Sequence, residues 1–111
     1  MTPSELASRP LSPAKTPLMR RDIAGYLREV PGWRLEGNRL NRIFSFPESG
    51  PAIEFLAGTL RFCQQEGHVP DIALSAGRHV EVSWYTYAAG GLTPDDFVMA
   101  AKLDARGTAK K

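Results

Sequence analysis

The stretch Gln64-Gln65-Glu66-Gly67-His68-Val69-Pro70-Asp71 joins an expected helix to an expected strand. Gly67 is well placed to end the helix, because glycine readily takes the left-handed conformation that closes many helices. Pro70 restricts the backbone just before the strand. A lone histidine, His68, stands between them, and Val69 occupies the next position, where a second imidazole could stand. The stretch is therefore a working catalytic loop, a reduced one, or an ordinary turn in which His68 binds nearby carbonyl groups.

Upstream of this stretch, the sequence predicts a hairpin and then a helix. Trp33–Glu36 and Arg39–Phe46 are expected strands, and Gly37-Asn38 between them is a tight-turn signal. One face of the second strand carries Leu40, Arg42, Phe44 and Phe46. Pro51 can open the helix. Its apolar stripe is expected at Ile53, Leu56, Leu60 and Cys63, with Phe55, Thr59 and Phe62 widening it.

Downstream, the sequence predicts a second hairpin and a last helix. The strands are Ile72–Ser75 and His79–Tyr87, joined by a turn at Ala76-Gly77. One face of the longer strand carries Val80, Val82, Trp84 and Thr86, and the other carries His79, Glu81, Ser83, Tyr85 and Tyr87. After a loop over 88–92, the last helix is expected to have Thr93 as its N-cap, Pro94 at its first position, Asp95 and Asp96 in its first turn, and its end near Arg106.

The beginning of the chain is read as a flexible arm followed by a helix. Residues 1–15 hold Pro3, Pro10 and Pro13 without any periodicity, which is typical of an arm. Thr16 and Pro17 then offer an N-cap and a first helical position. The helix face is expected at Ile23, Tyr26, Leu27 and Val30, before a stop at Pro31-Gly32. We therefore predict an arm over 1–15, a single domain over 16–106 and a basic tail over 107–111.

Composition excludes several classes of protein. The 111 residues, 42% apolar and 23% charged, suit one soluble domain with one core. A net charge of +2 is too small to argue for nucleic-acid binding. A single cysteine, Cys63, leaves no intrachain disulfide or cysteine-rich metal site, and a buried packing role is expected for it. No apolar run reaches membrane-spanning length and no signal peptide follows Met1, so we expect a cytoplasmic protein with no metal.

The order of elements predicts an α+β fold. Two hairpins joined by a helix can form one four-stranded antiparallel sheet, with three helices on one face in the order α-β-β-α-β-β-α. The opposite face and at least one sheet edge remain open. In a chain this small we expect a homodimer to cover them.

This order, together with particular residues, resembles the pterin-4a-carbinolamine dehydratase family from Trp33 to about Asp104. The family's Gly-Trp, its Leu-x-Arg-x-Phe-x-Phe strand and its Gly-Leu-Thr-x-x-Asp helix entry correspond to Gly32-Trp33, to the 40–46 strand and to the run from Gly91 to Asp96. Ala52 and Phe55 match its second helix, and His68, Pro70 and Asp71 match its histidine-histidine-proline-acid loop.

The resemblance implies that several proton-transfer groups are missing. Family enzymes dehydrate a 4a-hydroxy-tetrahydropterin without a metal or organic cofactor, and positioned imidazoles suit the two proton transfers. His68 keeps the first histidine position, while Gln64 stands at the acid position, Val69 at the second histidine and Tyr87 at the third. Asp96 is retained, either as a site residue or as a helix N-terminal charge. Neither glutamine nor valine moves a proton, and tyrosine is a weak base near neutrality.

Two functions follow from the resemblance. A catalytically depleted scaffold resembles the dehydratase-like branch associated with α-carboxysomes, whose members are assembly chaperones for RuBisCO. This reading predicts a RuBisCO large-subunit partner and carboxysome association. The alternative is an active or weakly active dehydratase that binds a tetrahydropterin, with His68 as acid and base assisted by Tyr87 and Asp96.

The other aromatic residues and the second histidine have expected roles in the fold or at a binding surface. Trp33 either stacks on a pterin or anchors the first strand. Tyr85 and Tyr87 form a partner strip or a dimer or core contact. Trp84 is expected in the core, and His79 on the surface of its strand.

Overall fold

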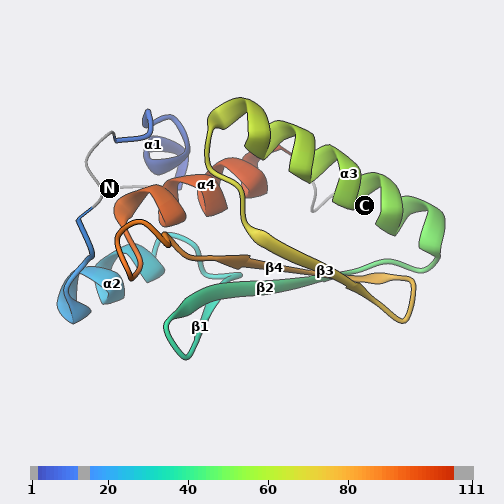
Figure 1. Ribbon diagram of the computed structural model, residues 1–111, viewed down its shortest axis with the longest axis horizontal. Helices are drawn as coiled ribbons and strands as arrows, with labels where there is room; N and C mark the ends of the chain where they lie inside the picture. Colours follow the sequence, from blue (N-terminus) through green and yellow to red (C-terminus); the bar gives the residue numbers. More distant parts are fainter. Residues whose placement is uncertain (1–2, 13–15, 107–111) are drawn as a thin grey trace.

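The computed structural model describes residues 3–12 and 16–106. The elements, in chain order, are α1 Pro3–Ala7, α2 Arg20–Leu27, β1 Arg34–Glu36, β2 Arg39–Ser45, α3 Ser49–Glu66, β3 Asp71–Ser75, β4 His79–Trp84 and α4 Pro94–Ala105. The four strands form one antiparallel sheet in the order β1-β2-β4-β3. Figure 1 shows α3 and α4 above the sheet with its lower face uncovered. The predicted four-stranded α+β fold is confirmed.

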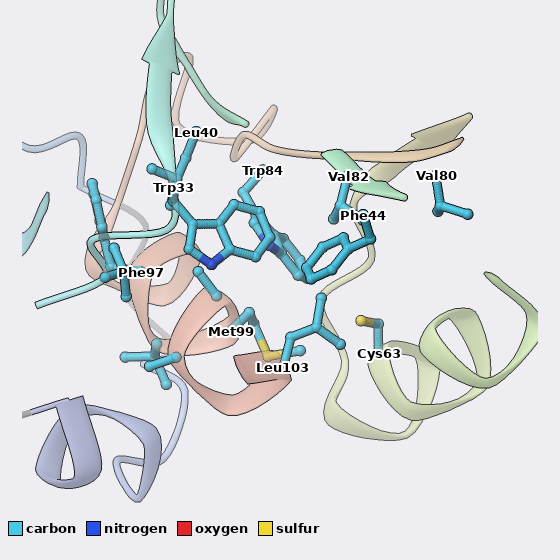
Figure 2. Packing of buried hydrophobic residues seen from close by; sticks show 14 of the residues in the cluster. Trp33, Leu40, Phe44, Cys63, Val80, Val82, Trp84, Phe97, Met99 and Leu103 are labelled. Atoms are coloured by element: carbon cyan, nitrogen blue, oxygen red, sulfur yellow. The ribbon is translucent and has the colours of Figure 1, made fainter. Parts of the chain in front are cut away.

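Alternation along the two central strands sets the buried face. Leu40 pairs with Trp84 and Phe44 pairs with Val80, and all four side chains are buried. Because side chains alternate along a strand, this register places the apolar residues of both strands on the helix side. Figure 2 shows them facing a layer that includes Cys63 of α3 and Met99 and Leu103 of α4.

Cys63 lies in this core with a fully buried side chain, as expected. Burial raises the pKa of its thiol to about 12, because removal from water disfavours the thiolate. It is therefore a packing residue without nucleophilic character near neutral pH.

The arm predicted over residues 1–15 is wrong for its described part. Pro3–Ala7 form α1, and Leu6 on this helix has no exposed surface. Five residues are too few to make a stable helix alone, so contact with α4 accounts for this helix. Residues 13–15 and the predicted basic tail over 107–111 lie outside the described residues.

The first expected helix begins later than the sequence suggested. Thr16 and Pro17 are not its start, because the N-cap is Met19 and α2 begins at Arg20. The backbone N–H of Leu18 donates to the carbonyl of Leu92 at 2.7 Å, which keeps this part of the chain out of a helix. Tertiary pairing therefore overrides a good local capping signal.

The buried stripe of α3 agrees in part with the prediction, since Phe55, Thr59 and Cys63 are buried as expected, while Ala52 is buried in place of Ile53. Its buried side chains are Ala52, Phe55, Thr59 and Cys63. Ile53, expected in the stripe, is 52% exposed. Both sets have helical spacing, and the sheet contacts Phe55, whose ring lies 4.7 Å from that of Phe44, so packing decides between them. The helix also begins at Ser49 rather than at Pro51.

Candidate functional site

The end of α3 places His68. Gly67 has φ +89°, and the backbone N–H groups of Gly67 and His68 both donate to the carbonyl of Cys63, at 2.9 and 3.2 Å. This closure matches the predicted glycine stop. It directs the imidazole against the indole of Trp84, with ring centroids 5.4 Å apart and planes 27° apart. The His68 side chain retains 12% exposure, so it is not completely closed off from solvent.

Asp96 meets His68 from the start of α4. It occupies the third position of a capping box with Thr93, the residue that the sequence predicted as the N-cap. Its Oδ1 lies 2.7 Å from Nε2 of His68. Its Oδ2 accepts hydrogen bonds from the hydroxyl of Thr86 at 2.8 Å and from the backbone N–H of Thr93 at 2.9 Å. The Asp96 carboxylate is completely buried, and every one of these contacts stabilises its charge.

The protons of this network can be assigned from its connectivity. The Thr86 hydroxyl donates to Asp96, so the Thr93 hydroxyl, 2.9 Å away, donates to the Thr86 oxygen. An ionised carboxylate only accepts hydrogen bonds. With Asp96 ionised, Nε2 of His68 is the donor to Oδ1, and in the neutral ring Nδ1 is then the nitrogen that carries the lone pair. The network holds one imidazole in one tautomer and orientation, the arrangement that a general base requires.

Tyr87 does not join this network. Thr86 faces Asp96 on the helix side, and the next side chain, Tyr87, lies on the open side of the sheet. Its hydroxyl donates to Oδ2 of Asp71 at 2.5 Å and accepts from Nη2 of Arg39 at 2.7 Å. Nη1 of Arg39 binds the same Asp71 oxygen at 2.6 Å. The phenol that stands at the third histidine position is thus held by residues outside the His68 pair.

The group formed by Arg39, Asp71, Tyr85 and Tyr87 is called the open-face cluster below. The Arg39 guanidinium lies 5.0 Å from the Tyr85 ring centroid and 5.4 Å from that of Tyr87. The hydrogen bond from Tyr87, followed by the bond from Arg39, holds the pKa of Asp71 below its usual range. Tyr87 itself is 64% exposed, so the predicted aromatic strip is accessible from solvent.

The other two substituted positions offer no proton-transfer group near His68. Val69 is 51% exposed, and Gln64 is exposed at the end of α3. In the hydrogen bonds of the described residues, Asp96 is the titratable side chain that contacts the His68 imidazole. His79 does not replace the missing imidazoles, because its Nδ1 pairs with the hydroxyl of Ser45 at 2.8 Å on the open face.

Trp33 belongs to the scaffold. It is 3% exposed, and its ring packs edge-on against Phe44 with centroids 5.9 Å apart, so no open face remains for a pterin. Its Nε1–H donates to both carboxylate oxygens of Asp104, at 3.0 and 3.1 Å. Arg42 also binds Asp104, at 2.9 Å. Of the two alternatives for Trp33, the structure supports the strand anchor, and Trp84 is in the core as predicted.

Asp104 was not singled out from the sequence. It stands near the end of α4 with no motif around it, and only the fold brings it to Trp33 and Arg42. Burial raises its pKa above the usual range, in spite of the opposing hydrogen bond from Trp33.

The described residues contain neither a metal-binding cluster nor a membrane-spanning helix. Within the described ranges, no group of three or more His, Cys, Asp or Glu side chains could hold a metal ion. No helix in the same ranges has the length and apolar character needed to cross a membrane.

Comparison with known proteins gives a family match that includes these residues. A family model described as pterin 4 alpha carbinolamine dehydratase matches residues 16–106. The chain belongs to this family. The match includes the end of α3, both hairpins and α4, and so covers the complete His68–Asp96 network.

Relatives of similar length carry the same family name. A protein from Azoarcus sp., named "Putative pterin-4-alpha-carbinolamine dehydratase", is 38% identical over 106 residues, covering 91% of this chain and 90% of its own. One from Cupriavidus pinatubonensis is 43% identical over 88 residues, which cover 78% of this chain and 75% of that protein. A crystal structure described as a transcriptional coactivator/pterin dehydratase from Brucella melitensis aligns with a TM-score of 0.73 and 26% identity, over 81% of this chain and 97% of that one.

Proposed function

We propose that this protein is a catalytically reduced pterin carbinolamine dehydratase that serves mainly as a protein-binding assembly factor. The observation that carries the proposal is the orientation of Tyr87. The phenol is bound by Asp71 and Arg39 on the open face of the sheet, while His68 is held on the helix side. With Val69 exposed and aliphatic, the titratable side chain that hydrogen-bonds to His68 among the described residues is the fully buried Asp96.

The chemistry of dehydration explains why this arrangement lowers activity. Loss of water from a 4a-hydroxy-tetrahydropterin requires a proton delivered to the departing hydroxyl group and a proton removed from a ring nitrogen. His68 alone would have to perform both transfers in turn. Each missing acid or base typically costs about 10²–10⁴ in rate, so two losses remove most of the catalytic advantage.

Weak dehydratase activity is the second candidate function. It is favoured by the intact His68–Asp96 pair, which leaves Nδ1 of His68 as a positioned acceptor. In this alternative a tetrahydropterin binds beside the His68 side chain, and the reaction uses no other cofactor.

A turnover assay with a 4a-hydroxy-tetrahydropterin separates the two functions. We expect a rate far below that of family members with all three histidines. Val69→His, next to His68 in the chain, should raise the rate more than Tyr87→His, whose side chain would leave position 87 on the open face. His79→Gln is the matched control, because it removes a histidine from the open face without touching His68. A full family rate in the natural sequence, abolished by His68→Gln, would contradict the proposal.

The proposed partner is the RuBisCO large subunit, with carboxysome association, and this part rests on the resemblance to the α-carboxysome branch. Accessible apolar surface at two former histidine positions supports a protein-binding role, since Val69 and Tyr87 are 51% and 64% exposed. We expect co-expression to raise the yield of assembled RuBisCO. Tyr87→Ser should reduce that gain, and Met19→Ser, at a residue 65% exposed, should not. An equal yield with and without the protein excludes this role.

We further propose that the protein is a homodimer. The sheet is covered by helices on one face only, and β1 and β3 are its two edge strands (Figure 1). A second copy could cover the open face or pair with an edge. Sedimentation at micromolar concentration tests this proposal, and a purely monomeric species contradicts it.

A further inference from the structure

The first described residues of the chain, 3–12, are called the N-terminal segment here. They lie outside the family match, which begins at residue 16. The Brucella structure aligns over 97% of its own length and 81% of this chain. The N-terminal segment is nevertheless folded onto the family domain, because Leu6 belongs to the main core and α1 packs on α4 (Figure 1).

The N-terminal segment contacts the first turn of α4 directly. The backbone N–H of Ser12 donates to Oδ1 of Asp95 at 2.9 Å, and Asp95 is only 2% exposed. A buried carboxylate is held firmly when it accepts hydrogen bonds, because releasing them leaves its charge poorly solvated. Asp95 immediately precedes Asp96, so this bond is made one residue before the His68 partner.

A second contact of the N-terminal segment acts, through Tyr26, on the residue that follows Asp96 in the chain. The Arg9 guanidinium lies 5.9 Å from the ring centroid of Tyr26, and its Nη1 lies 3.4 Å from the Tyr26 hydroxyl. The Tyr26 ring in turn stacks on Phe97, with centroids 5.3 Å apart and planes 23° apart. Phe97 follows Asp96 in the chain and is fully buried.

We infer that the N-terminal segment is a positioning element for the His68–Asp96 pair. Asp96 stands between two residues, Asp95 and Phe97, that the segment holds directly or through Tyr26. The 2.7 Å bond to His68 depends on where the first turn of α4 lies, since Oδ1 projects from that turn. Loosening the segment therefore weakens the constraint on the imidazole while the sheet stays intact. This role holds whether His68 transfers protons or only supports the fold.

Two substitutions in the full chain test the inference. Leu6→Ala removes apolar contact between α1 and the core, and Ser12→Pro removes the N–H that binds Asp95 together with the Ser12 hydroxyl. Ser4→Ala is the matched control, because Ser4 is exposed and the contacts with Asp95 and Tyr26 are made by Ser12 and Arg9. The measured quantity is solvent exchange of the His68 Nε2–H proton, followed by nitrogen-15 NMR. The chain has two histidines, so His79→Gln assigns the signal.

We expect both variants to exchange this proton at least tenfold faster than the natural protein and the Ser4→Ala control. The backbone amides of β4 should keep their protection. Unchanged exchange of the His68 proton in both folded variants overturns the inference. Equal acceleration of the His68 proton and the β4 amides also overturns it, because the segment would then stabilise the whole domain rather than the site. If Leu6→Ala does not fold, Ser12→Pro alone decides between these outcomes.

Discussion

The two ends of α4 each tether the helix with a carboxylate, but they do so in different surroundings. Asp96, in the first turn, has a side chain with no exposure and accepts bonds from His68, Thr86 and the Thr93 backbone. Asp104, near the last turn, is 31% exposed and accepts bonds from the side chains of Trp33 and Arg42. The first end fixes the loop that follows α3, and the second fixes the first hairpin.

The residues that resemble the family fall into two groups, one at each end of α4. One group supports the fold, and the other forms the candidate site. Trp33 and Arg42 belong to the Asp104 end and hold β1 and β2 against α4. His68 and Asp96 form the other end, where the carboxylate is fully buried and the imidazole is 12% exposed. A family likeness carried by Trp33 and Arg42 therefore reports the fold, and only the Asp96 end bears on proton transfer.

The sharpest test of the comparison is removal of the buried carboxylate. Asp96→Ala leaves the buried donors of Thr86 and Thr93 and the partly buried His68 without their acceptor. We expect a loss of about 3 to 5 kcal/mol in the free energy of unfolding, measured by urea denaturation. Asp22→Ala is the matched control, because Asp22 is an exposed acid in the first turn of α2. Its loss should stay within about 0.5 kcal/mol.

The second test removes the carboxylate at the other end. Asp104→Ala should cost about 2 kcal/mol, because water can reach the partly exposed site and replace some of the lost hydrogen bonding. The same denaturation experiment measures it. A cost equal to or above that of Asp96→Ala would show that the two ends do not differ as described.

A smaller effect is expected at Gly32. A Cβ added there would lie 2.7 Å from Nη1 of Arg42, so Gly32→Ala should push the guanidinium away from Asp104. The cost should be about 1 kcal/mol, since the end of a long side chain can move. In a double-mutant cycle with Asp104→Ala, the two losses should be less than additive. Gly58→Ala, in α3 with nothing within 4 Å of the added Cβ, should instead stabilise the protein.

The smallest expected effect is a change of stability with pH, which has opposite signs for the carboxyl groups of Asp104 and Asp71. Burial raises the pKa of Asp104 in the folded state above its value of 3.8 in the unfolded chain. Its contribution to the free energy of unfolding is therefore present below pH 3.8 and is lost as the pH rises through the folded-state pKa. Relative to Asp104→Asn, the natural protein should lose stability as pH rises above 3.8.

Asp71, in the open-face cluster, should behave in the opposite way. Its folded-state pKa is lowered by the bonds from Tyr87 and Arg39, so its contribution is present above pH 3.8 and is lost as pH falls through the folded pKa. Comparison of the natural protein with Asp71→Asn across this acid range measures the effect. Equal pH slopes in the natural protein and both variants would contradict the assignment of the two environments.

Sequence patterns predicted the elements whose signals are local. The alternation of Val80, Val82 and Trp84, the Gly67 stop and the Thr93 N-cap all appear in the structure as expected. Each depends on residues close together in the chain, so its physical cause is visible in the sequence.

Other features depended on contacts that no local pattern contains. Leu6 is buried only because α4 lies beside α1, and Asp104 matters only because the first hairpin reaches it. The neighbouring side chains of Thr86 and Tyr87 alternate as predicted. Their separate partners, Asp96 on one side and Asp71 on the other, come from the assembled sheet.

The lone cysteine gives the molecule a built-in chemical reporter. With its thiol pKa raised to about 12, Cys63 should resist alkylating reagents while the core is closed. Its carbonyl accepts the N–H groups of Gly67 and His68, so an opening of α3 that exposes the sulfur also releases the histidine loop. The rate at which a reagent alkylates the Cys63 sulfur would therefore report how often the loop opens, and no labelled residue has to be introduced.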